Sequence, residues 1–117
     1  MIEQVIHALH VPLRWTSEAD LQRQIGARLE LTPQHVAAEV RLDARDRIDF
    51  LLEPSGIGVE VKVDGSLSEV TRQLHRYAQH DRIRALVLAT TKAKHIPVPR
   101  ELSGKPVCVV HMTGGAW

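Results

Sequence analysis

Two carboxylates and a lysine lie close together between residues 47 and 62. Asp49 is followed, after ten intervening residues, by Glu60-Val-Lys62. Carboxylate oxygens are the ligands that magnesium prefers, and the ion usually takes one or two of them together with water and substrate phosphate. A lysine beside such an ion can orient an attacking water and stabilise negative charge. These residue types could hold a divalent cation with a basic group beside it, provided that the fold brings them together.

A predicted β-hairpin would gather the three groups. Residues 47–52 and 57–63 read as strands around a Pro-Ser-Gly turn signal. Side chains alternate along a strand, so Glu60 and Lys62 share one face of the second strand, opposite its valines. The first strand is expected to place Asp49 on that same side. Its apolar face is expected to hold Ile48, Phe50 and Leu52.

The length of the turn decides which residue lies opposite Asp49. A loop of Pro54 and Ser55 places it opposite Glu60, and a loop of Ser55 and Gly56 places it opposite Lys62. Two facing carboxylates repel, so a sheet that keeps them there normally gains something, such as a bound cation. The alternative is an exposed polar face on which the lysine neutralises both acids.

A third acid, Glu18, lies at the start of a predicted helix. Thr16 or Ser17 offers an N-cap for this helix. At about 100° per residue, Glu18 points close to the direction of Ile25, in the apolar stripe of the helix. One interpretation is an acid that reaches the metal. The other is a residue favoured at a helix start by the helix dipole and still open to water.

The remaining patterns predict the elements that must position these groups. Apolar residues at helical spacing indicate a helix over residues 2–9, and the capping box Ser66 to Glu69 opens another with an apolar inner face. Alternation predicts a strand over residues 36–42, and two apolar runs predict further strands. The expected order is helix, helix, three strands, helix and two strands, which is an α/β fold with a mixed sheet. The helix that follows Ser66 is expected to bury Leu67, Val70, Leu74, Tyr77 and Ala78. The strand over residues 36–42 is expected to place Val36, Ala38, Val40 and Leu42 on one face. The last two strands are expected over residues 84–91 and 107–112.

Length and composition narrow the class of protein. A chain of 117 residues with 44% apolar content predicts a single domain over residues 1–117, of which 1–15 form an accessory N-terminal segment. No signal-like start or membrane-length apolar run is present, so we expect a soluble, cytoplasmic protein. One cysteine excludes an internal disulfide and an all-cysteine metal site. A net charge of +1 makes no argument for nucleic acid by itself.

The pattern Asp49, ten residues, Glu60-Val-Lys62, on a hairpin behind a helix that carries a glutamate, resembles the PD-(D/E)XK nuclease superfamily. The order helix, three strands, helix, strand is similar to the core of that family, a restriction-endonuclease-like fold. Gln73 and Tyr77 on the next helix resemble the Q-x-x-x-Y element of its RecB-type exonuclease branch, close to Holliday junction resolvases. The proline of the family signature is Ile48 in this chain.

The resemblance implies a set of site residues. Catalysis would fall to Asp49, Glu60 and Lys62, and a magnesium or manganese ion would be held by Glu18, Asp49, Glu60 and the Val61 carbonyl. Gln73 and Tyr77 would position the substrate or the lysine. Phosphate contacts would come from basic residues that carry affinity without sequence information, namely Arg72, His75, Arg76, Lys92 and Lys94.

Two other interpretations remain at this stage. The domain could bind nucleic acid, DNA by the resemblance, without cutting it, because fold alone does not fix function. The chain could also be a subunit whose first helix, with an exposed apolar stripe, docks on a second copy or on a partner protein. No pattern in the sequence distinguishes DNA from RNA or an end from an interior position.

Overall fold

The computed structural model describes residues 1–114. Its helices and strands follow the predicted order, with two short additions late in the chain. They are α1 (Ile2–Leu9), α2 (Glu18–Leu29), β1 (His35–Arg41), β2 (Arg47–Glu53), β3 (Ile57–Lys62), α3 (Leu67–Ala78), β4 (Ala85–Thr90), the 3-10 helix η1 (Ala93–His95), β5 (Glu101–Leu102) and β6 (Lys105–His111).

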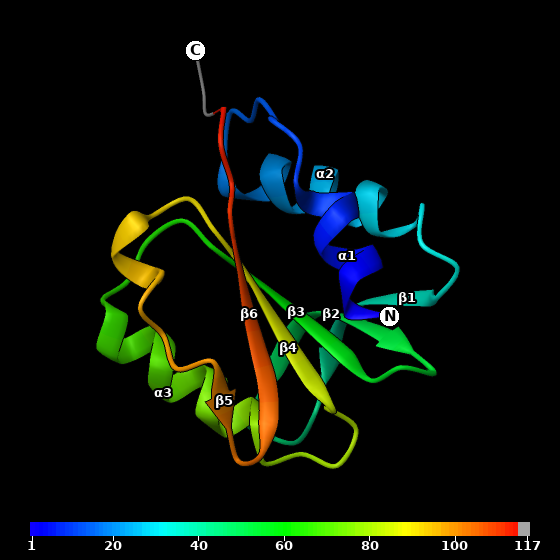
Figure 1. Ribbon diagram of the computed structural model, residues 1–117, viewed down its shortest axis with the longest axis vertical. Helices are drawn as coiled ribbons and strands as arrows, with labels where there is room; N and C mark the ends of the chain where they lie inside the picture. Colours follow the sequence, from blue (N-terminus) through cyan, green and yellow to red (C-terminus); the bar gives the residue numbers. More distant parts are fainter. Residues whose placement is uncertain (115–117) are drawn as a thin grey trace.

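The six strands form one mixed sheet in the order β1-β2-β3-β4-β6-β5. The first three strands are antiparallel neighbours, whereas β3, β4 and β6 run parallel to one another. Helix α3 forms the crossover from β3 to β4 (Figure 1). Since Lys62 pairs with Thr90 at the ends of these two strands, the loops that follow both strands leave the sheet at one edge.

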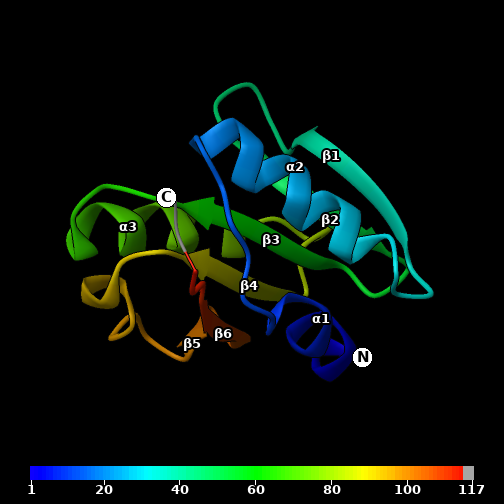
Figure 2. The same cartoon turned by 90° about the horizontal axis from the view of Figure 1, so that it is seen from above.

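Helices cover both faces of the sheet. Figures 1 and 2 show α1 and α2 on one side and α3 on the other. The core therefore divides into two apolar clusters, one under α1 and α2 and one under α3. Val5, Leu21 and Ile25 are buried in the first cluster, and Leu74 and Tyr77 in the second. The helical periodicity of the sequence thus predicted the inner face of each helix.

Two caps start the longer helices as the sequence indicated. Ser17 is the N-cap of α2, and its hydroxyl accepts a hydrogen bond from the Asp20 amide at 3.1 Å. At the start of α3, the Ser66 hydroxyl accepts from the Glu69 amide while the Glu69 carboxylate accepts from the Ser66 amide. Each cap satisfies amides that have no partner within the helix, so the predicted capping box is confirmed.

The predicted alternation of β1 and β2 is wrong at one point. Phe50 and Leu52 pack in the cluster under α2, but Ile48 packs in the cluster under α3. The side chains of both strands change faces between the pair Ala38–Phe50 and the pair Val40–Ile48. Glu39 lies between these pairs with a left-handed φ of 51°, and neither Glu39 nor Asp49 is paired between the two strands. Likewise, Val36 of β1 lies against the first cluster, whereas Val40 of β1 and Leu42, which follows the strand, lie against the second.

A glycine makes room for the displaced isoleucine. A Cβ at Gly58 would lie 2.5 Å from Cδ1 of Ile48, closer than side-chain atoms pack. Gly58 lies opposite Leu51, on the face of the sheet that α3 covers. The bare backbone at this position therefore allows Ile48 to point to the α3 side.

The apolar stripe of α1 covers the core, which is one of the two roles that the sequence left open, and is not exposed for docking. Val5 and Leu9 lie in the first core cluster, and Ile2 and Ile6 are partly buried against it. The stripe therefore packs on the sheet of its own chain and is not evidence for docking on another protein. Among the described residues, every helix is too short or too polar to traverse a lipid bilayer.

The loop after β4 contains a buried histidine that the sequence did not single out. The His95 side chain is fully buried, with Nδ1 2.6 Å from Oγ1 of Thr90 and Nε2 2.7 Å from the Gly65 carbonyl. A carbonyl only accepts, so Nε2 carries a proton that it donates to the Gly65 carbonyl. His95 thus ties the loop after β4 to the loop after β3.

Candidate functional site

Asp49 and Glu60 meet where β2 and β3 separate. Regular pairing ends with Phe50 opposite Val59, which is the first of the two predicted registers and brings Asp49 beside Glu60. Beyond that rung, the Asp49 amide donates to Oε1 of Glu60 at 3.2 Å, and the Val61 amide donates to Oδ2 of Asp49 at 2.8 Å. Two carboxylates therefore take the place of one backbone rung.

Groups from β3 and α3 surround the Glu60 carboxylate. The Lys62 ammonium lies 3.5 Å from Oε2 of Glu60. The Tyr77 hydroxyl lies 3.3 Å from the same oxygen and 3.0 Å from the Arg47 carbonyl, to which it donates. Gln73 donates its amide to that hydroxyl at 2.7 Å. The Gln73 and Tyr77 pair, which was singled out by its resemblance to the Q-x-x-x-Y element, therefore reaches the carboxylates through the tyrosine.

Burial makes this pair of acids reluctant to ionise. Only 4% of the Glu60 surface is exposed, and burial together with the nearby Asp49 charge raises the pKa of Glu60 to about 8, against the opposing effect of Lys62. Burial also raises the pKa of Asp49 despite the hydrogen bond from the Val61 amide. The pKa of the Tyr77 hydroxyl rises as well, by burial and by the Glu60 charge. A dication would relieve this strain, since it favours the ionised carboxylates.

Helix α2 contributes one residue that sequence analysis missed. Gln22 donates its side-chain amide to Oδ1 of Asp49 at 3.1 Å. Glu18, one helical turn earlier, is exposed at the first position of α2. It does not lie within an apolar stripe, which starts only at Leu21, although its charge contributes to the raised pKa of Asp49. The spacing of four from Glu18 is the signal that could have identified Gln22.

A cleft of about 300 Å³ lies between Lys62 at the end of β3 and helix α3. We name it the lysine cleft, because Lys62 forms part of its wall. Of the predicted phosphate contacts, Arg72 and Arg76 lie in it, whereas His75, Lys92 and Lys94 do not. Its lining is Lys62, Asp64, Gly65, Glu69, Val70, Arg72, Gln73 and Arg76.

The two lysines of the loop after β4 are exposed at the same edge of the sheet as Lys62. Lys92 follows Thr90 by two residues, and the neighbouring Thr91 amide donates to the Lys62 carbonyl at 3.0 Å. Lys94 belongs to η1, which His95 holds in place. A phosphate contact from either side chain stays a prediction.

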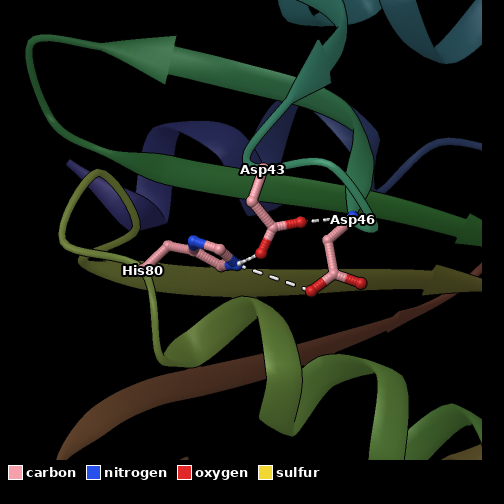
Figure 3. Close-up of side chains that lie close together, drawn as sticks. All are labelled: Asp43, Asp46 and His80. Carbon is pink, nitrogen blue, oxygen red and sulfur yellow. Dashed lines mark hydrogen bonds and ion pairs between the residues drawn. The ribbon is translucent and has the colours of Figure 1, made fainter.

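A second group of ionisable side chains lies between the β1–β2 loop and the end of α3. Asp43, Asp46 and His80 each offer a ligand atom within 4.8 Å of the others, so the group could hold a metal ion (Figure 3). The His80 Nε2 lies 3.3 Å from Oδ2 of Asp43 and 3.4 Å from Oδ2 of Asp46. The sequence did not predict this group, because His80 lies more than 30 positions from both Asp43 and Asp46.

Existing contacts already satisfy the charges of the second group. The buried Asp46 carboxylate pairs with Nε of Arg76 at 3.1 Å as well as with His80. The amides of Arg45 and Asp46 both donate to Oδ1 of Asp43, and these bonds lower the pKa of Asp43. The contacts of Asp43 and Asp46 with Arg76 and His80 hold the β1–β2 loop against the end of α3, and we name them the lock.

No family model matches this chain, and neither a curated protein nor a solved structure matches it. Functional inference therefore rests on the residues of the two groups and the clefts beside them.

Proposed function

We propose that this protein is a metal-dependent nuclease that hydrolyses phosphodiester bonds in nucleic acid, in the manner of the PD-(D/E)XK enzymes that its sequence resembles. One observation carries the proposal. Asp49 and Glu60 lie together at the point where two strands part, with Lys62 3.5 Å from Glu60 and with raised carboxyl pKa values. Perturbed acids beside a lysine and a cleft are typical of functional sites.

The donor set fits a hard cation. Magnesium and manganese take carboxylate and carbonyl oxygens, which Asp49, Glu60 and the Val61 carbonyl can supply. Such an ion supplies a water of lowered pKa and neutralises charge on the scissile phosphate. Glu18 is close enough to add to the electrostatic field at Asp49, so we assign it an outer role through water rather than direct ligation.

The remaining residues position the reacting groups. Lys62 orients the attacking water and stabilises negative charge that develops on the phosphate. Gln22 fixes the orientation of Asp49, and Tyr77, held by Gln73, fixes that of Glu60. Arg72 and Arg76 bind the phosphate backbone in the lysine cleft. Cutting would be nonspecific or dependent on substrate structure, since only about 55 residues lie outside the site-bearing segment 16–77, too few for a separate recognition domain.

A binding module without catalysis is the second candidate. The Asp49 bond to the Val61 amide and the Lys62 pair with Glu60 hold the carboxylates without any cation. Such a module would keep the basic residues of the clefts and bind nucleic acid with no need for magnesium.

Cleavage of labelled single-stranded, duplex and branched DNA with and without magnesium tests the proposal. We expect cutting only with the metal, and its loss in Asp49→Ala and in Lys62→Ala. The control is Asp43→Ala, which removes an exposed carboxylate of the second group and should cut like the unmodified protein. Cutting that persists in both site variants would reflect a contaminating nuclease and would reject the assignment.

A further inference from the structure

A second cleft, of about 520 Å³, lies beside the lysine cleft along α3. We name it the arginine groove. It runs between the outer face of α3, the β1–β2 loop and β5, and it shares Arg72 and Arg76 with the lysine cleft. These two arginines therefore form a ridge between two neighbouring hollows. The lining of the groove is Arg45, Thr71, Arg72, His75, Arg76 and Leu102.

The charge of the arginine groove differs from that of the other hollows. Its lining contains three arginines and a histidine and no carboxylate. Four other clefts on the described surface each include at least one acid, such as Asp64 and Glu69 in the lysine cleft. An anionic ligand would therefore find attraction in this groove without a competing carboxylate in its wall.

The arginines of the groove are also available to a ligand. Among the ion pairs between described residues, none uses Arg45 or Arg72, and the Arg72 guanidinium donates to the Ser68 hydroxyl at 2.6 Å. Arg76 is anchored through Nε by Asp46, which leaves the outer nitrogens of its fork free to point elsewhere. The lock between the β1–β2 loop and α3 thus sets the position of Arg45 relative to α3.

We propose that the arginine groove binds the phosphodiester backbone of the same nucleic acid strand whose scissile bond lies beside Lys62. The strand crosses the ridge of Arg72 and Arg76 and continues to Arg45 and His75. This inference rests on the proposed function for its substrate and extends it, because it assigns Arg45 a role and makes the footprint longer than the lysine cleft.

Binding measured without cleavage tests the groove. The probes are fluorescein-labelled single strands of about 4 and about 20 nucleotides, chosen to bracket the usual site sizes, in EDTA over a range of salt. We expect Arg45→Glu to weaken binding of the long strand about tenfold and to reduce its salt slope by about one unit per lost phosphate contact. Binding of the short strand should change little, since it can occupy the lysine cleft alone.

Arg84→Glu is the matched control. Arg84 is exposed and precedes β4, so it lies at the opposite end of the parallel strands from Lys62. Arg84→Glu changes the net charge by the same amount as Arg45→Glu, but at a position away from the arginine groove. Equal weakening by Arg84→Glu and Arg45→Glu, or no effect of Arg45→Glu on the long strand, would overturn the proposal. His75→Gln should reproduce a smaller part of the effect.

The two proposals fail in different ways. A protein that binds through Arg45 but never cuts with magnesium would reject the nuclease and keep the groove. A protein that cuts with magnesium and binds long strands without Arg45 would reject the groove and keep the nuclease. Melting temperatures of Arg45→Glu and Arg84→Glu, measured alongside, show whether either variant has lost its fold.

Discussion

The two carboxylate groups of this protein have similar composition and opposite electrostatics. Each contains two acids and a basic partner, and each is fastened to α3, by Tyr77 in one case and by Arg76 in the other. At Asp49 and Glu60 the pKa values are raised, chiefly by burial, whereas backbone amides lower the pKa of Asp43. The comparison teaches that nearby ligand atoms alone do not mark a cation site. The pair whose ionised form is disfavoured by burial gains most from a cation.

Loss of one acid of the destabilised pair should have the largest effect. We expect Asp49→Asn to reduce magnesium-dependent cleavage about 10³-fold, because an electrostatic contact to the transition state is lost. The variant keeps an acceptor for the Val61 amide and removes one of two facing charges, so its melting temperature in EDTA should not fall. Cleavage rates and thermal unfolding measure the two parts. If Asp49→Asn cut at the normal rate, Asp49 and Glu60 would not be the cation site that distinguishes them from Asp43 and Asp46.

The raised pKa of Glu60 predicts how stability depends on pH. The carboxyl ionises near its ordinary pKa of 4.5 in the unfolded chain but only near 8 in the folded protein, since burial and the Asp49 charge oppose ionisation. Between these values the folded state binds more protons, so stability of the metal-free protein falls as pH rises and levels off above about 8. Unfolding by urea at pH 5 and pH 8 measures the change, which we expect to be a few kcal/mol at most. Glu60→Gln should flatten it.

The second group should respond in stability rather than in catalysis. Asp46→Ala leaves Arg76 and His80 without their shared partner, which should lower the free energy of unfolding by about 1–3 kcal/mol. We expect kcat to stay within about threefold, because the reacting groups are elsewhere. Denaturant unfolding and steady-state kinetics check the two expectations. If zinc or magnesium stabilised the unmodified protein but not Asp46→Ala, with normal response in Asp49→Asn, the roles of the two groups would be reversed.

The smallest effect should come from the tyrosine that supports Glu60. Tyr77→Phe removes a hydroxyl that accepts from Gln73 and donates to the Arg47 carbonyl, at a cost of about 1 kcal/mol. Cleavage should fall about tenfold as Glu60 loses its positioning contact. Gln73→Ala keeps the hydroxyl beside Glu60 and should lose less activity. Equal losses of activity in both variants would show that Tyr77 can position Glu60 only when Gln73 holds its hydroxyl.

Local patterns predicted most of the fold. Periodicity and caps determine the helices, and the turn at residues 54–56 determines the hairpin that brings Asp49 to Glu60. Contacts between distant segments escaped sequence reasoning. Nothing local indicates that Asp46 meets His80, or that His95 reaches Gly65 across 30 positions. The predicted face of Ile48 was wrong because it also depends on another segment: the left-handed Glu39 of β1 lies where the side chains of β1 and β2 change faces.

The site itself was predictable where one element carries it. Spacing alone placed Lys62 beside Glu60 and Gln73 beside Tyr77. The direction of Glu18 depended on where α2 begins, and the observed start leaves it exposed. Raised carboxyl pKa values could not be read from the sequence, because they arise from burial under the docked α3.

Where β2 and β3 separate, Asp49 has a structural role that is independent of catalysis. Its carboxylate takes up the Val61 amide that a neighbouring backbone would otherwise bind, so a residue without an acceptor at this position would disturb the sheet as well as the site. An inactive descendant of this protein would therefore still be under selection to keep a side-chain acceptor, aspartate or asparagine, at position 49. Lys62 has no comparable structural duty, since its ammonium makes a 3.5 Å contact and reaches solvent. Across relatives, the lysine rather than the aspartate would record whether catalysis has survived.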